Sequence, residues 1–256
     1  MNKNKHENSI ENKHLKKRKR KPLNTKKIAV ILCVLFGAVL FMLSPVFTIK
    51  NIEITTMDKY SKDELCDMLN LKTGTNMFLF NRFKASKVLK NNNYVDDYDI
   101  SYKFPDTIKI DITERKVRGY VPYMGSYLYI DEYGRVLEIN SQMSSALPVV
   151  EGLKFDTFVL GEKINAENKE AFDIMVTIAQ LMNKYELLDI VVKIDVSDIN
   201  KVTAFVNNIE VNLGDMSNGD QKIRTMGEVV KNLGPNDRGV LDLSDLSKPI
   251  VFKYLT

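Results

Sequence analysis

Histidine is nearly absent from this sequence. Only His6 and His14 occur among the 256 residues, and both precede residue 28. The rest of the chain has no imidazole for a Ser-His-Asp or Cys-His catalytic group or for the usual histidine zinc sites. It also has no phosphate-binding glycine loop, H-E-x-x-H or G-x-S-x-G motif. Paired carboxylates stay open as catalytic groups, because acidic residues are plentiful, but no spacing singles out two of them.

Cysteine is also scarce. Cys33 lies inside a long apolar run and Cys66 lies well beyond it, so the two are not expected to form a disulfide within one chain. The fold must therefore depend on a packed core rather than on a disulfide framework. Cys66 falls in a predicted helix, where a lone thiol most often acts as a small packing residue.

Acidic residues are few at the start of the chain. The first 27 residues hold 11 of the 37 basic residues and only 2 of the 33 acidic ones, although the whole chain has a net charge of +4. Residues 28–256 hold 26 basic against 31 acidic residues, a net of −5. The sequence pI of about 8.8 thus reflects a basic tail and not a nucleic-acid-binding face. We expect no nucleic-acid partner.

A run of uncharged residues from 28 to 47 follows this basic tail, and only Ser44 and Pro45 interrupt its apolar character. About 20 such residues in a helix span a hydrocarbon core of about 30 Å. Since basic flanks stay in the cytoplasm, the N-terminus is predicted to lie inside and everything after Phe47 outside. A cleaved signal peptide, a buried core helix and a transit peptide are the alternatives. The length, the basic flank and the lack of a small-residue cleavage site favour an uncleaved anchor.

The segment after the anchor predicts a small unit of βααββ order. Ser61 and Glu64 have the spacing of a helix capping box. Ile108, Ile110 and Ile112 alternate with polar residues, as in a strand with one buried face. The predicted strands are 47–54, 95–104 and 107–114, and the predicted helices are 60–69 and 83–90.

The remainder predicts a mixed sheet with two main helices, so the chain as a whole belongs to the α+β class. Gly134 suits a tight hairpin turn, and Asn207 with Asn208 suits another. Asp220 is expected to cap the second helix. The predicted strands are 127–130, 135–139, 147–150, 158–160, 190–196, 202–206, 209–213, 239–243 and 249–254, and the predicted helices are 167–187 and 221–233.

Several segments together are typical of one family. They are Phe47-Thr-Ile-Lys-Asn-Ile-Glu-Ile54, Lys72-Thr-Gly-Thr-Asn-Met-Phe78, Phe104-Pro-Asp-Thr-Ile-Lys-Ile-Asp-Ile-Thr-Glu-Arg115, Tyr127-Leu-Tyr-Ile-Asp-Glu-Tyr-Gly-Arg-Val136 and Leu147-Pro-Val-Val-Glu-Gly152. With the basic tail and single span, this arrangement resembles the FtsQ/DivIB cell-division proteins over nearly the whole chain. The resemblance implies four regions: a cytoplasmic tail at 1–27, a transmembrane helix at 28–47, a POTRA domain at 48–116 and a β-domain at 117–256.

The resemblance also implies a function. Such proteins are non-catalytic, single-pass scaffolds at the division septum, with the domains after the anchor outside the cytoplasm. They bind single-span division proteins of the FtsL and DivIC/FtsB type and help regulate septal peptidoglycan synthesis. No enzyme activity, cofactor, metal or small-molecule substrate is then expected. The alternatives are a POTRA-type protein-assembly or export factor of the envelope and a membrane-anchored hydrolase.

In similar proteins the last strand binds the partner, and an edge strand can do so through its unpaired backbone groups. Relatives often have a basic and an aromatic residue after the Asp-Leu that corresponds to Asp242-Leu243, where this chain has Ser244 and Asp245. Side-chain contacts therefore do not carry over one for one. The predicted partner-binding residues are Lys248, Pro249, Ile250, Val251, Phe252, Lys253 and Tyr254.

Overall fold

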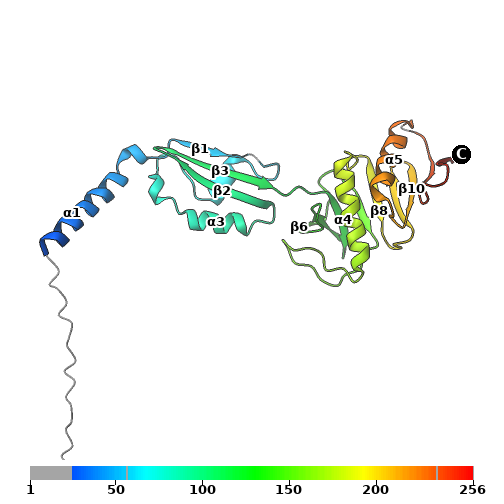
Figure 1. Ribbon diagram of the computed structural model, residues 1–256, viewed down its shortest axis with the longest axis horizontal. Coiled ribbons are helices and arrows are strands. Elements are labelled where there is room, and N and C mark those ends of the chain that lie inside the picture. Colours follow the sequence, from blue (N-terminus) through cyan, green and yellow to red (C-terminus); the bar gives the residue numbers. More distant parts are fainter. Residues whose placement is uncertain (1–24, 56, 235, 256) are drawn as a thin grey trace, which may run out of the picture.

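The computed structural model describes residues 25–55, 57–234 and 236–255. The basic tail predicted for 1–27 therefore lies almost wholly outside the described residues. Along the described chain, a long N-terminal helix leads into a three-stranded sheet with two helices, and then into a nine-stranded sheet with two more (Figure 1). The α+β class predicted from the sequence is confirmed.

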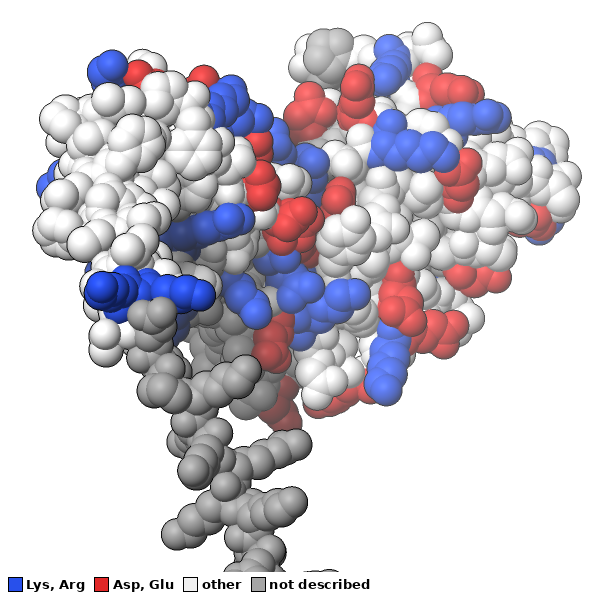
Figure 2. Space-filling view, turned by 60° about the vertical axis from the view of Figure 1, so that its left-hand side comes forward, with Lys and Arg blue, Asp and Glu red and all other residues white. Residues whose placement is uncertain are grey.

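Helix α1 runs over Thr25–Met42 and buries none of its residues. It is long and apolar enough to cross a membrane. Figure 2 turns the side of the molecule that carries α1 toward the viewer, and a broad area on its left shows no charged side chain. Basic side chains, in blue, lie where the grey residues begin. The helix was expected to continue to residue 47, but a 3-10 turn, η1, occupies Pro45–Phe47. Pro45 lacks the N–H that an α-helix would need there.

The three-stranded sheet has the order β1-β3-β2, with β1 parallel and β2 antiparallel to β3. Apolar residues of the helices and strands form one core, which includes Leu65, Leu89, Ile108 and Ile110. The predicted capping box is confirmed, since the Ser61 hydroxyl and the Glu64 carboxylate each accept a hydrogen bond from the other residue's backbone. The elements are β1 (Asn51–Ile54), α2 (Lys62–Met68), the 3-10 turn η2 (Met77–Leu79), α3 (Arg82–Lys90), β2 (Val95–Lys103) and β3 (Thr107–Glu114).

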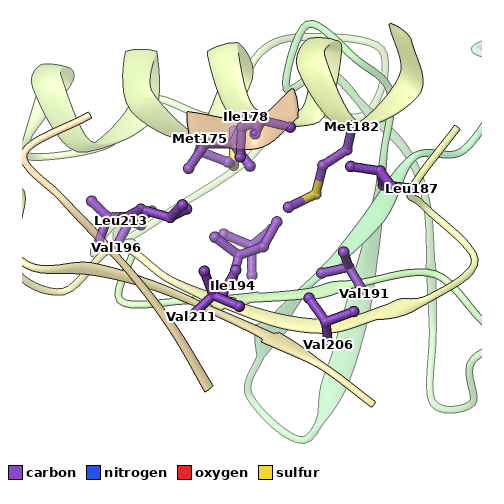
Figure 3. Packing of buried hydrophobic residues seen from close by; sticks show 14 of the residues in the cluster. Met175, Ile178, Met182, Leu187, Val191, Ile194, Val196, Val206, Val211 and Leu213 are labelled. Carbon is purple, nitrogen blue, oxygen red and sulfur yellow. The ribbon is translucent and has the colours of Figure 1, made fainter. Parts of the chain in front are cut away.

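The nine-stranded sheet has the order β12-β11-β10-β9-β8-β7-β4-β5-β6. Helices α4 and α5 lie side by side over it (Figure 1). Met175, Ile178 and Met182 of α4 lie on the side of the helix that faces the sheet, opposite apolar strand residues such as Ile194 and Val206 (Figure 3). The elements are β4 (Gly119–Tyr123), β5 (Ser126–Ile130), β6 (Val136–Asn140), β7 (Val149–Glu151), α4 (Lys169–Lys184), β8 (Val191–Asp195), β9 (Val202–Val206), β10 (Ile209–Gly214), α5 (Gly219–Lys231), β11 (Gly239–Asp242) and β12 (Val251–Tyr254).

Three local predictions for this sheet domain were wrong or incomplete. Residues 158–160 form no strand, because the chain there turns toward β6 and makes its contacts after Gly161. Strand β4 was not foreseen. Asn218 rather than Asp220 precedes α5. The Asp220 carboxylate instead accepts hydrogen bonds at 2.7 and 2.9 Å from Lys184, the last residue of α4, and from Tyr185, which follows it. Asp220 thus joins the two helices.

Candidate functional site: an open sheet edge

Strand β12 forms one edge of the nine-stranded sheet. Its sequence, Val-Phe-Lys-Tyr, has the β-branched and aromatic residues that favour strands. It pairs antiparallel with β11, with Val251 opposite Asp242 and Tyr254 opposite Gly239. Of the seven residues predicted for partner binding, four form this strand and Lys248, Pro249 and Ile250 form the segment that leads into it.

The backbone N–H and C=O groups of successive β12 residues face alternately toward β11 and away from it. The N–H of Leu255 donates to the carbonyl of Arg238 at 2.9 Å. Because bonded and non-bonded pairs alternate along an antiparallel ladder, Val251 and Lys253 also direct their backbone groups to β11. Phe252 and Tyr254 therefore direct theirs outward. No other strand of the described chain pairs with that side.

The side chains of this segment divide between core and surface. Phe252 is half-buried, packs against the core, and meets the Tyr254 ring edge-on at 4.7 Å between centroids. Ile250, Val251 and Tyr254 are exposed by 47%, 47% and 65%. An apolar strand with exposed side chains and an open backbone edge can accept a further strand.

A short loop with its own hydrogen bonds connects β11 to β12. The Asp242 carboxylate accepts bonds from the backbone and hydroxyl of Ser244, and Asp245 accepts the corresponding pair from Ser247. Hydrogen bonds from Ser247 and from Lys248, which lies 3.1 Å away, lower the pKa of Asp245 to about 2. Asp245 is therefore ionised at neutral pH. Ser244 and Asp245 thus help to order this loop.

Strand β6 forms the opposite edge, and a loop covers its first part. The N–H of Val136 donates to the carbonyl of Glu162 at 2.9 Å, and the N–H of Gly161 donates back to Val136 at 2.7 Å. Arg135 also bridges to Lys163 in antiparallel fashion. This loop satisfies backbone groups that would otherwise face solvent.

The three-stranded domain covers the next part of β6. The Asn93 amide donates to the Leu137 carbonyl at 3.1 Å, and the Leu137 side chain joins the core of the three-stranded domain. The Glu138 carboxylate accepts a hydrogen bond from the Tyr94 hydroxyl at 2.7 Å and pairs with Lys59. We call these contacts the interdomain joint. They close an edge that the sequence pattern alone did not distinguish from β12.

A hollow of about 620 Å³ lies beside the interdomain joint. Its lining mixes both charges, and Lys59 and Lys116 are already paired with Glu138 and Asp58. The described residues hold no group of three or more side chains suited to bind a metal ion. Burial raises the pKa of the Cys66 thiol, which makes it a weaker nucleophile at neutral pH. The paired lysines beside the hollow fit a structural contact between the two domains.

Two family models match the chain. The model of the FtsQ-type POTRA domain matches residues 47–115, and that of the C-terminal region of cell division protein FtsQ/DivIB matches residues 119–246. Strand β12 lies just beyond the second match.

Individual relatives agree. The chain is 25% identical to cell division protein DivIB of Clostridium botulinum strain Hall, over 92% of this chain and 93% of that protein. It is 24% identical to DivIB of Listeria monocytogenes, over 95% of this chain and 88% of the relative, and 24% identical to DivIB of Staphylococcus aureus strain NCTC 8325, over 76% and 46%. With both of its domains matched in order behind one apolar helix, the chain belongs to the FtsQ/DivIB family of cell division proteins.

Proposed function

We propose that this protein is a non-catalytic, membrane-anchored scaffold of the bacterial division septum. Helix α1 crosses the membrane with its N-terminus in the cytoplasm, and both sheet domains lie outside. Membership of a cell division family, one apolar helix and an open sheet edge support this proposal. The role of the protein is to hold other division proteins and thereby regulate septal peptidoglycan synthesis.

Partner binding takes place at β12 by addition of a strand. The partners are single-span division proteins of the FtsL and DivIC/FtsB type. The one observation that carries this proposal is that β12 is an apolar edge strand with outward backbone groups at Phe252 and Tyr254. A partner segment in extended conformation can bond to these groups and lay its side chains against Ile250 and Val251.

The test removes one backbone N–H that faces the open side of β12. Tyr254→Pro removes an N–H that faces the open edge, while the bonds of Lys253 and Leu255 to β11 remain. The fixed φ of proline is also compatible with an edge strand. We expect capture of the FtsL- and DivIC-type partners by the full-length protein in detergent to weaken about tenfold or more, with the unfolding midpoint little changed.

Tyr254→Ala is the matched control, because it removes the same side chain and keeps the backbone donor. It should retain most of the capture. Equal capture by Tyr254→Pro and the wild type would contradict strand addition at β12. Equal loss in both variants would instead assign binding to the tyrosine ring.

A further inference from the structure

The POTRA domain, residues 47–115, exposes four large apolar side chains that are either in contact or close in sequence, and we call them the apolar tip. It consists of Phe78, Leu79, Phe83 and Phe104, exposed by 41%, 70%, 89% and 62%. They come from η2, from the first turn of α3 and from the turn between β2 and β3. Apolar side chains gathered on a surface in this way mark a site of interaction.

The apolar tip is continuous with the membrane helix. Phe47 contacts Phe41 of α1 and Phe78 of the tip, with ring centroids 5.3 and 5.1 Å apart, and Phe78 lies 6.0 Å from Phe104. The Asn76 amide donates to the carbonyl of Met42, the last residue of α1, at 2.9 Å. The tip therefore starts where the apolar surface of α1 ends, on the side of the domain from which α1 projects (Figure 1).

The segment that carries most of the apolar tip is basic. Residues 68–95 contain five basic residues and no acidic one, although the chain after residue 27 carries a net charge of −5. Arg82 and Lys84 flank Phe83, and Lys72 lies in a loop that bonds to Ile49 through Gly74 at 2.9 Å. In the described part of the chain none of the five pairs with a carboxylate. The five are Lys72, Arg82, Lys84, Lys87 and Lys90.

We propose that the apolar tip inserts into the interfacial layer of the outward-facing leaflet. Aromatic rings are stable at this depth, and Lys72, Arg82 and Lys84 would meet anionic lipid headgroups there. The occupant is the bilayer itself, since the tip continues a helix long and apolar enough to span it and the basic residues next to the tip are opposite in charge to anionic lipid. A second contact beside α1 fixes the tilt of the POTRA domain, so that β12 points away from the membrane.

The chain lacks tryptophan, so a single introduced indole reports on one position. Phe83→Trp is placed in the full-length protein and reconstituted into vesicles of phosphatidylcholine and phosphatidylglycerol. At 89% exposure this substitution leaves the core intact. We expect blue-shifted emission and strong quenching when the phosphatidylcholine carries bromine on its acyl chains. The result does not depend on which way the protein inserts into the vesicle, because the tip lies next to the end of α1 and reaches the adjacent leaflet in either orientation.

Tyr254→Trp is the matched control, since it is also exposed but lies on β12, toward the end of the molecule opposite α1 (Figure 1). It should emit as a solvated indole and resist quenching. A second arm combines Phe83→Trp with Arg82→Gln and Lys84→Gln, which should reduce the quenching. The proposal is overturned if the indole of Phe83→Trp emits and quenches like the indole of Tyr254→Trp. These vesicles contain no partner protein, so the result is independent of partner capture.

Discussion

The two edges of the nine-stranded sheet differ in what lies against them. The β6 edge meets a loop from the same domain and the interdomain joint, which together bond to Val136 and Leu137 and pair with Glu138. The β12 edge has no such cover in the described residues and exposes Val251 and Tyr254. A sheet with one closed and one open edge can grow in one direction only.

The difference shows that an edge is closed by what packs and bonds against it, here a loop and side chains of the three-stranded domain, rather than by its own sequence. Strand β6 reads Val-Leu-Glu-Ile-Asn and β12 reads Val-Phe-Lys-Tyr, and each is mostly apolar with one charged residue. A glycine stands at a close approach beside each edge. Gly161 lets the loop approach Asn93, and Gly239 lets β12 approach β11. Alanine at each position tests each edge separately.

Gly239→Ala should have the largest effect. A Cβ at this position would lie 2.4 Å from the Lys253 carbonyl and 2.5 Å from the Phe252 ring, and the first of these atoms belongs to the backbone. Strand β12 must therefore shift away from β11. We expect partner capture to fall more than tenfold, faster amide exchange along β12 and a loss of about 1–3 kcal/mol in the free energy of unfolding.

Gly234→Ala serves as the control for this variant, since the nearest atom to its Cβ would be Asp237 at an ordinary 3.4 Å. It should leave capture and exchange unchanged. If Gly239→Ala kept full capture, the attached position of β12 would not be needed for binding.

Gly161→Ala should weaken the covered edge and leave the open one alone. Gly161 has a φ of +83°, and a Cβ there would lie 2.7 Å from the Asn93 side-chain oxygen. The strained backbone and the displaced amide, which bonds to Leu137, should together lower the free energy of unfolding by about 1–2 kcal/mol. Urea unfolding measures this loss, and amide exchange should rise in β6.

Partner capture by Gly161→Ala should match that of the wild type. A loss of capture comparable to that of Gly239→Ala would mean that the two edges are coupled. The independence inferred from their separation in the sheet would then be wrong.

The features that could be predicted from the sequence are those that depend on residues close together in the chain. The Ser61 capping box and the hairpin at Asn207, which has a φ of +51°, are confirmed because each is built within a few residues. The isoleucines of β3 are buried as their alternation predicts. The α+β class followed from the sum of such local patterns.

Contacts between distant segments could not be predicted in this way. Tyr94 and Glu138 are 44 residues apart, and nothing in either segment indicates the other. Lys222 is a charged residue of α5, yet it is 1% exposed and donates to the Leu213 carbonyl at 2.7 Å. The edge position of β12 was expected from the family resemblance and not from periodicity, since a strand pattern does not reveal which neighbours a strand has.

Lowering the pH should destabilise the contacts at the β6 edge, by less than either glycine substitution does. Burial raises the pKa of Glu138, but hydrogen bonds from Lys59 and Tyr94 outweigh it and hold this pKa below the ordinary value of 4.5. A carboxylate with a lowered pKa stabilises the fold above its unfolded-state pKa, and this contribution is lost as pH falls through the folded-state value. The interdomain joint should therefore weaken below pH 4.5.

Glu138→Gln isolates this charge, because its amide oxygen can still accept the Tyr94 hydroxyl while the pair with Lys59 is gone. Both partners of that pair are partly exposed, so we expect a loss of about 0.5–1 kcal/mol in the free energy of unfolding at neutral pH. The gap between variant and wild type should close as the wild-type carboxylate takes up its proton. A gap that stayed constant with pH would show that the carboxylate contributes by shape and hydrogen bonding alone. The joint would then cover β6 without electrostatic help.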